Sequence, residues 1–382
     1  MSLARWMLVT VAFVAALTLT SCAPESEMDT EPELATEADA SPESADADDT
    51  SDETVDDESG DESAAGPAES FMEDEGPAPV PDVAMGVEVP QDPGYVVEEV
   101  TDGLYWVTEG SYTTMFLTTG EGVIVVDAPP SIGENVLAAI GDVTDEPVTH
   151  VIYSHSHADH IAAAGMYPED ATVIAHSATA DQLERTMGGD QSYEYGVFVG
   201  GGPVPLPDTV FDDSMTLEVG DQVLQLDYHG INHEPGNLFV YAPDQKVLLL
   251  VDVIFPGWVP FKSWALAEDV PGYFEAHDQV LAYDFDHLVA GHLNRLGTRQ
   301  DVETQQAYLQ DVEAAAAEAL STVDFMAIGT EVGFGNPWVL FDTYLDAVAQ
   351  ACADTVEAEW VGELGGADVF TFDHCFKTME SL

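Results

Sequence analysis

The chain has 382 residues, of which 73 are acidic and only 7 are Lys or Arg, so its formal net charge is -66. Its hydrophobic content of 46% is enough for a buried core, whereas three cysteines are too few for a disulfide-built scaffold. The scarcity of cations excludes nucleic-acid binding through a basic patch and argues against unaided adsorption to an anionic membrane.

The first 22 residues predict the signal peptide of an exported lipoprotein. Arg5 precedes an apolar run from Trp6 to Leu19, which is shorter than a typical membrane span. The ending Leu19-Thr20-Ser21-Cys22 resembles the lipobox of bacterial lipoproteins, in which the cysteine is lipidated. We therefore expect lipidated Cys22 to attach the protein to a membrane of the cell envelope, in an outer-membrane or periplasm-facing location. A plain signal peptide or a short anchor is the alternative.

Residues 23–82 predict an acidic, disordered tether. Between residues 24 and 75 the chain has 22 acidic residues, no Lys or Arg, and almost no large apolar side chain before Phe71 and Met72. Such a segment cannot bury enough apolar area to offset the entropy lost on ordering. The rest of the chain is acidic as well, which we interpret as adaptation to concentrated salt, where repulsion between carboxylates is screened. The alternative is an anionic surface that recruits cations or a basic partner.

From residue 83 onward, the hydrophobic pattern predicts alternating strands and helices. The expected elements, in chain order, are strands at 103–108, 113–119 and 123–127, a helix at 132–140, a strand at 148–153, a helix beginning at 161, a strand at 172–175, strand-rich blocks at 216–228 and 238–251, a helix at 273–283 and a strand at 286–290. This order indicates a layered α/β domain over 83–300. Two helical segments, one following Arg299 and one at 337–359, predict a C-terminal helical extension over 301–382.

A dense histidine cluster carries the strongest chemical signal. Three of the eleven histidines fall within His155-Ser156-His157-Ala158-Asp159-His160, directly after the strand predicted at 148–153. In an extended segment, His155 and His157 point the same way and can share one metal ion, while Asp159 and His160 can face a second. Imidazole and carboxylate ligands suit zinc, with iron or manganese as alternatives.

The motif H-x-H-x-D-H after a core strand resembles the metallo-β-lactamase superfamily. Three further segments match that family's order: His233 in H-E-P-G-N, Asp252 at the end of L-L-L-V-D, and His292 at the end of L-V-A-G-H. The resemblance covers about residues 103–295 and implies an αββα sandwich. It also implies a ligand set for two metals: His155, His157 and His233 on the first, Asp159, His160 and His292 on the second, and Asp252 bridging both. Asp127 would hold the ligand loop.

The activity implied by this resemblance is that of a dinuclear zinc hydrolase. In such an enzyme a hydroxide held between two Zn²⁺ ions attacks a small ester, lactone or lactam, and Asp159 is the expected catalytic residue because it accepts or orients the proton. Zinc β-lactamases of the family carry Cys or Ser where this chain has Asp252, which argues against a true β-lactamase. The alternative is β-lactamase-like or thioesterase activity of the same fold. A mononuclear iron oxygenase of the same fold and a non-catalytic lipoprotein that binds metal or a partner are others, although neither requires the full ligand set.

Several other residues have two interpretations each. The aromatic segment 258–264 could form a hydrophobic substrate wall or belong to the core. Lys262 and Arg295 are rare cations near predicted ligands, and they could hold a substrate carboxylate or make ordinary ion pairs. Cys352 and Cys375 would meet an oxidising compartment if the protein is exported, so they could pair, or they could be two buried free thiols.

Overall fold

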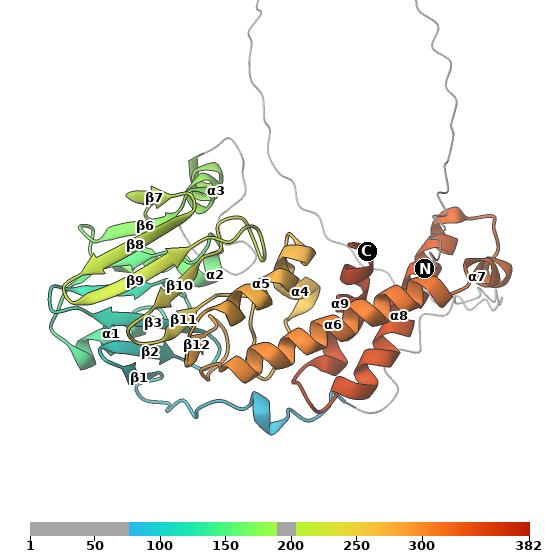
Figure 1. Ribbon diagram of the computed structural model, residues 1–382, viewed down its shortest axis with the longest axis horizontal. Coiled ribbons are helices and arrows are strands. Elements are labelled where there is room, and N and C mark those ends of the chain that lie inside the picture. Colours follow the sequence, from blue (N-terminus) through green and yellow to red (C-terminus); the bar gives the residue numbers. More distant parts are fainter. Residues whose placement is uncertain (1–75, 189–203) are drawn as a thin grey trace, which may run out of the picture. The chain divides into compact units, whose positions relative to one another are not determined.

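Two β-sheets and the helices that cover them make up the part of the chain that positions the histidine cluster (Figure 1). The computed structural model describes residues 76–188 and 204–382. The expected signal peptide at 1–22, Cys22 and most of the expected tether at 23–82 lie outside these residues. Within the described ranges, no helix combines the length and the apolar character needed to cross a membrane.

The first sheet has seven strands in chain order: β1 (Val96–Thr101), β2 (Leu104–Thr108), β3 (Thr113–Thr118), β4 (Val123–Val126), β5 (Val148–Ile152), β6 (Thr172–His176) and β7 (Thr209–Phe211). Strands β1 to β4 pair antiparallel, whereas β4 to β7 pair parallel. Because the carboxyl ends of β4 and β5 therefore meet at one edge, Asp127 and the histidine cluster emerge side by side. The predicted strands at 103–108, 113–119, 123–127, 148–153 and 172–175 are confirmed to within one residue at each end.

The second sheet has five strands in the order β12-β11-β10-β9-β8: β8 (Ser214–Val219), β9 (Gln222–Asp227), β10 (Phe239–Ala242), β11 (Val247–Leu249) and β12 (His287–Val289). Only β11 and β12 pair parallel. The block predicted at 238–251 is two short strands, because the chain reverses at a turn in which Lys246 has a positive φ of 54°. The carboxyl ends of β11 and β12 then bring Asp252 and His292 to a common edge.

Helices cover the outer face of each sheet, so the expected αββα sandwich is confirmed. Helices α1 (Asn135–Val143), α2 (Ala158–Ile161) and α3 (Ser177–Gly188) follow strands of the first sheet, and a buried cluster joins Val136 and Ile140 of α1 to Val125 and Val151. Helices α5 (Val270–Ala282) and α6 (Arg299–Thr322) lie on the second sheet. Between the sheets, a buried apolar core contains residues of both, among them Ile124 of β4 and Leu249 of β11.

The two predicted helix starts at 132 and 161 are wrong by three residues each. At the first, the amides of Ile132 and Gly133 both donate to the carbonyl of Pro129, which forms a turn, so α1 begins only at Asn135. At the second, His157 is the N-cap of α2, so the helix begins inside the histidine cluster. Asp159 and His160 consequently lie on a helical turn, not on an extended loop.

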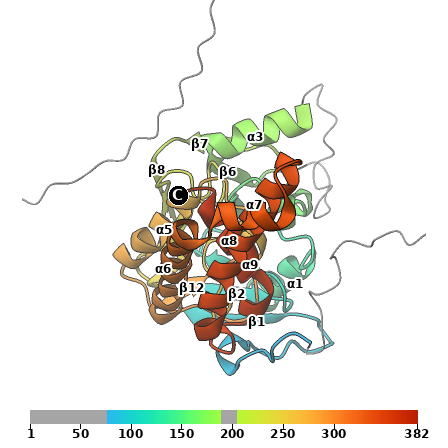
Figure 2. The ribbon, with the colours of Figure 1, turned by 90° about the vertical axis from the view of Figure 1, so that its right-hand side faces the viewer.

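The C-terminal region is helical, as predicted, and it shares one core with the second sheet. Besides α6, it consists of α7 (Phe325–Val332), α8 (Pro337–Trp360) and α9 (Ala367–Met379). Sequence explains where these helices begin: Thr298 and Asp301 form a capping box at α6, Asp324 caps α7, and Asn336 followed by a proline caps α8. Figure 2 shows α8 and α9 with α6 in one group.

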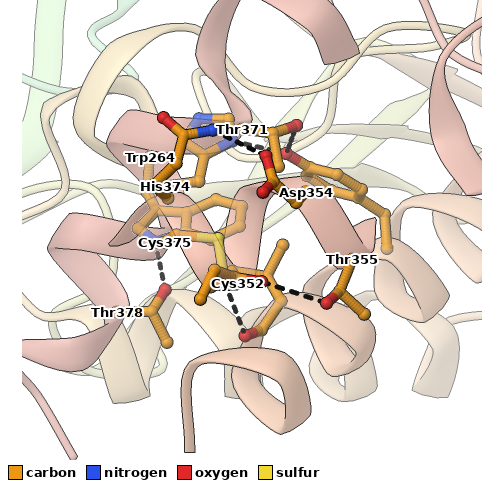
Figure 3. Close-up of a disulfide and its surroundings, with 12 residues drawn as sticks. Trp264, Cys352, Asp354, Thr355, Thr371, His374, Cys375 and Thr378 are labelled. Atoms are coloured by element: carbon orange, nitrogen blue, oxygen red, sulfur yellow. Dashed lines mark hydrogen bonds between the residues drawn. A yellow bond between two sulfur atoms is a disulfide. The ribbon is translucent and has the colours of Figure 1, made fainter. Parts of the chain in front are cut away.

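A disulfide joins Cys352 of α8 to Cys375 of α9, so the two cysteines pair (Figure 3). Next to it, the ring of His374 stacks on Trp264 with centroids 4.0 Å apart. Trp264 is fully buried, and its indole Nε1 donates to Thr378 Oγ1 at 3.0 Å. This side chain therefore belongs to the core and not to a substrate wall.

Trp264 lies in α4 (Lys262–Leu266), a turn with unusual backbone conformation. Ser263, Trp264 and Ala265 all have positive φ values, between 55° and 57°. For residues other than glycine the left-handed region costs roughly 1–2 kcal/mol each, so tertiary contacts must hold this turn. Helix α9 supplies several of these contacts: the Asp373 carboxylate accepts from the Ser263 amide, and Trp264 contacts His374 and Thr378. The Trp264 ring also packs against rings of α5 and α6.

Residues 76–82, which the sequence prediction assigned to the tether, are among the described residues. The amide of Ala78 donates to Asp368 Oδ2 at 2.6 Å, and a short 3-10 helix follows at Asp82–Ala84. The segment 76–82 contains one acid and three prolines, whereas the preceding tether is densely charged. Low charge allows it to lie against α9.

Candidate metal centre

The predicted ligands meet where the carboxyl ends of strands from both sheets face each other. The histidine cluster follows β5, His233 lies in the connection from β9 to β10, and Asp252 and His292 follow β11 and β12. Asp127, directly after β4, supports the cluster: its Oδ1 accepts from the Ser154 amide at 2.7 Å, and its carbonyl accepts from the Tyr167 hydroxyl at 2.8 Å.

Seven side chains form two overlapping groups. His155, His157, His233 and Asp252 make up one, and Asp159, His160, Asp252 and His292 make up the other. Within each group, one nitrogen or oxygen from every residue lies within 4.8 Å of all the others. These are the two sets that the family resemblance implies, and Asp252 belongs to both.

Asp252 lies at the centre of the seven. Its Oδ2 is 3.2 Å from His233 Nε2, 3.3 Å from His160 Nε2 and 3.5 Å from His155 Nε2. Its Oδ1 is 2.8 Å from His292 Nε2. One carboxylate therefore reaches histidines of both groups, which is the arrangement that a ligand shared between two cations requires.

The donor set fits divalent metal ions. Ring nitrogens of different histidines point at one another: His233 Nε2 lies 2.9 Å from His157 Nδ1, and His160 Nε2 lies 3.2 Å from His292 Nε2. Imidazoles arranged in this way turn their donor atoms toward a common point. Three histidines with one carboxylate, and two histidines with two carboxylates, are ligand sets that zinc, iron and manganese accept.

Burial controls the protonation of two histidines of the first group, His155 and His157, whereas the pKa of the third, His233, is raised because the Asp252 carboxylate outweighs burial. Burial lowers the pKa of His155 well below its ordinary value, and neighbouring histidines lower it further. Burial also lowers the pKa of His157, although the Glu234 carboxylate works in the opposite direction. Both shifts favour neutral imidazole, which is the form that binds a metal.

In the second group, nearby charges outweigh burial in setting the pKa values of His160 and Asp252. Burial by itself would lower the pKa of His160, but the carboxylates of Asp252 and Asp159 outweigh it and raise the pKa to about 9. Burial by itself would raise the pKa of Asp252, but His160 and His292 outweigh it and hold the pKa well below its ordinary value. The central carboxylate is therefore charged, and cations are attracted to this site.

The ligands of the centre differ in exposure. The side chains of His155, His160 and His233 are at most 1% exposed, whereas those of His157, His292 and Asp159 are 34%, 17% and 13% exposed. A substrate can therefore approach from the side on which the last three residues lie.

The sequence patterns did not identify two residues of the site, Tyr112 and Glu234. The hydroxyl of Tyr112 donates to Asp159 Oδ2 at 3.1 Å, and its ring lies 4.5 Å from that of His292. Burial and the Asp159 carboxylate raise the pKa of Tyr112, so the hydroxyl keeps its proton. Buried Glu234 accepts from the amide and the hydroxyl of Ser156, and its Oε2 is 3.3 Å from His157 Nε2. An acid next to His233 in H-E-P-G-N was the one hint of the second residue.

The other candidates from the sequence are the aromatic segment 258–264, Arg295 and Lys262. Of the aromatic segment 258–264, Phe261 lies near the centre through a neighbour: its ring is 6.4 Å from that of Phe255, which was not a candidate and which stacks on His292 with centroids 5.9 Å apart. Arg295 is held by Asp301 at the start of α6, which assigns it to an ion pair and not to a substrate carboxylate. Lys262 is exposed at the start of α4.

Comparison with known proteins identifies a family model and several similar proteins. Residues 107–294 match the family model described as the metallo-beta-lactamase superfamily. The chain is 25% identical over 249 residues to the 2,4-dinitroanisole O-demethylase subunit alpha of Nocardioides sp. (strain JS1661), covering 63% of this chain and 68% of that one. It is 23% identical over 221 residues to the linear primary-alkylsulfatase of Pseudomonas sp. (strain ATCC 19151), covering 48% of this chain and less than half, 42%, of the alkylsulfatase.

Two solved structures are also similar. The metallo-beta-lactamase from Pontibacter korlensis has 19% identity and a TM-score of 0.47, with 56% of this chain and 99% of that chain covered. A stereoselective inverting sec-alkylsulfatase from Pseudomonas sp. has 17% identity and a TM-score of 0.49, with 75% of this chain and 50% of that chain covered.

Proposed function

Residues 107–294 form a domain of the metallo-beta-lactamase superfamily, and from this premise we propose that the protein is a dinuclear zinc hydrolase of small esters, lactones or lactams. The observation that carries the proposal is the meeting of two metal-ligand groups at Asp252, beside an open side. We assign His155, His157 and His233 to one ion, Asp159, His160 and His292 to the other, and Asp252 to both. A divalent ion bound there lowers the pKa of its coordinated water from ~15.7 toward ~7.

The residues on the open side have complementary tasks in this proposal. Asp159 is 13% exposed and accepts the proton of the attacking water, while the Tyr112 hydroxyl fixes the orientation of its carboxylate through the 3.1 Å hydrogen bond. Glu234 positions the cluster from behind, because it binds Ser156 and faces His157. Phe255 packs on His292 and offers an apolar wall to the substrate.

The surroundings favour a neutral substrate. Among the described residues, the side chains that contact the ligands include Ser154, Tyr112, Glu234 and Phe255, and none of these is cationic. Arg295 is occupied by Asp301. The names of two relatives, an O-demethylase subunit and an alkylsulfatase, describe removal of a group attached through oxygen, which places esters and lactones ahead of lactams.

We further propose that the enzyme is exported and attached through lipidated Cys22, as its first residues suggest. A lipid anchor would place it where small esters and lactones of the envelope are available. Labelling of the cells with a fatty-acid analogue, followed by capture of the wild type and of Cys22→Ser, tests this part. Equal labelling of both chains would contradict it.

The test of the hydrolase proposal combines metal analysis with a substrate panel. We expect two zinc ions per chain by mass spectrometry of the purified protein, and hydrolysis of p-nitrophenyl acetate or a homoserine lactone above that of nitrocefin and p-nitrophenyl sulfate. Asp252→Ala should lose bound metal and at least about 100-fold in kcat/KM, since it removes a ligand from both ions. His150→Gln, on the strand before the cluster, is the matched control and should retain both properties.

Each contrary outcome has a distinct meaning. Full activity of metal-free protein would refute the hydrolase mechanism. One ion per chain with full activity would refute the dinuclear centre alone. Two ions without turnover of any substrate class would favour a metal-binding lipoprotein.

A further inference from the structure

A group of large apolar side chains is exposed on α7, on the first half of α8, and on the loop between them. Trp338 is 83% exposed, and Met326, Phe334, Phe341 and Val339 are 61%, 54%, 51% and 48% exposed. We call this group the α7–α8 surface. Figure 1 shows α7 at the end of the helical region that is distant from both sheets, so the surface does not border the metal centre.

The α7–α8 surface is almost uncharged, although the protein is extremely acidic. Residues 325–341 contain one charged side chain, Glu331, whereas charged residues make up 21% of the chain. A contiguous exposed apolar area of this kind on a folded protein marks an interaction site. Depletion of charge is also the compositional sign of an interface core.

Packing within the segment forms this surface in advance. The rings of Phe325 and Tyr344 lie 5.2 Å apart and hold α7 against α8. A Cβ atom added to Gly329 would lie 2.3 Å from the ring of Phe334, so this glycine allows the connecting loop to close onto α7. Association therefore need not first order the segment, which lowers its entropic cost.

The α7–α8 surface combines a projecting side chain, Trp338, with a shallow groove beside it. On α8, Trp338, Phe341 and Leu345 follow one another at helical spacing and share one face. Together with Val339 and Asp342 they line a shallow groove of about 360 Å³. Because strongly exposed Trp338 borders this groove, a twofold-related copy can offer its own Trp338 to it and receive the other in return.

The available area matches what a dimer requires. At roughly 150–250 Å² per aromatic side chain, the exposed fractions of Trp338 and of the three phenylalanines amount to several hundred Å², and exposed Met and Val side chains add to this area. A standard interface buries about 800 Å² per partner. The α7–α8 surface can therefore supply most of one side of a dimer interface.

A lipid surface fits less well than a second copy. Helices that lie on anionic membranes carry Lys and Arg on their polar face, yet residues 300–376 contain neither. Acidic side chains such as Asp342 border the surface instead. We therefore propose that the α7–α8 surface is the interface of a homodimer, formed by antiparallel contact between the first halves of two α8 helices.

The net charge gives this dimer a distinctive salt dependence. Two chains of formal charge -66 repel each other, and the screening length falls from about 30 Å at 0.01 M to about 3 Å at 1 M salt. The dimer should therefore tighten as salt concentration rises, whereas most interfaces between opposite charges loosen.

Sedimentation equilibrium of the full chain tests the proposal, in a Cys22→Ser background so that no lipid is attached. We expect twice the chain mass at micromolar concentration in 2 M KCl, and a dissociation constant at least about 10-fold higher in 0.1 M KCl. Trp338→Ser combined with Phe341→Ser should raise the dissociation constant in 2 M KCl at least about 100-fold. Val369→Ser, an equally apolar exposed position on α9, should not.

Unchanged circular dichroism and metal content of the Trp338 and Phe341 variant would show that it is folded. A wild-type monomer at every salt concentration would overturn the proposal, and so would a variant that dimerises as the wild type does. Binding of a wild-type monomer to phosphatidylcholine vesicles, lost in the variant, would assign the surface to a membrane instead. These outcomes do not depend on whether the metal centre hydrolyses esters.

Discussion

Removal of the Cys352–Cys375 disulfide should destabilise the protein by an amount that its position in the chain allows us to calculate. The two cysteines are separated by 23 residues. The loop-closure entropy that the bond removes from the unfolded chain corresponds to about 3 kcal/mol at 25 °C. Against a typical domain stability of about 5–15 kcal/mol, the loss is large and measurable. Serine at both positions is the appropriate variant because it is close in size to cysteine.

The same variant should also affect the metal centre indirectly. Helix α9, which the disulfide holds to α8, supplies Asp373, His374 and Thr378 to the left-handed turn of α4. Phe261 precedes that turn and lies against Phe255, which stacks on His292. We therefore expect KM to rise by about 2–5-fold with zinc content unchanged, because the apolar wall loosens while the ligands stay in place.

Urea unfolding followed by circular dichroism measures the stability effect at constant salt concentration. The midpoint of the Cys352→Ser, Cys375→Ser variant should fall with an unchanged slope, since a shift without a change in slope reports stability. Reductant should lower the midpoint of the wild type to that of the variant and leave the variant itself unchanged. The single variant Cys22→Ser should behave like the wild type. A loss below about 1 kcal/mol, or an equal effect of reductant on both proteins, would refute the calculation.

Three further predictions follow from buried polar groups. Burial lowers the pKa of His277 and of His374 from the ordinary 6.5 to about 4. Because the unfolded chain binds more protons than the folded chain in this range, the free energy of unfolding should fall as pH decreases from 6.5 to 4, by about 3 kcal/mol for each histidine. Urea titrations that show no loss of stability in this range would contradict this prediction. Tyr112→Phe should reduce kcat by about 10-fold at unchanged zinc content, because Asp159 loses its oriented hydrogen bond; an unchanged kcat would remove this residue from the mechanism. Glu234→Gln should weaken zinc binding by about 10–100-fold in a competition assay with a chelator, as expected for a group that holds a ligand loop; wild-type affinity would show that the carboxylate is dispensable.

The metal ligands could be predicted because short segments carry them. His155, His157, Asp159 and His160 fall within six residues after a buried strand, and the three distant ligand segments end or connect strands that the hydrophobic pattern also predicts. The predicted starts of two helices were less accurate, because a turn that includes Pro129 precedes α1 and because α2 begins inside the histidine cluster. Local signals locate an element more reliably than they locate its first residue.

The sequence by itself determined the order of strands and helices, the types of metal ligand and the extreme charge, since each depends on residues near one another in the chain. Only the tertiary structure decided which distant groups meet. Tyr112 reaches Asp159 across 47 residues, Glu234 reaches Ser156 across 78, and Arg295 turns to Asp301 instead of the substrate side. It also decided that Cys352 and Cys375 pair, that Trp264 is core, and that the apolar face of α7 and α8 stays uncovered within the described residues of one chain. Such contacts depend on how sheets and helices pack, and hydrophobic periodicity specifies which face of an element is buried without specifying what lies against it.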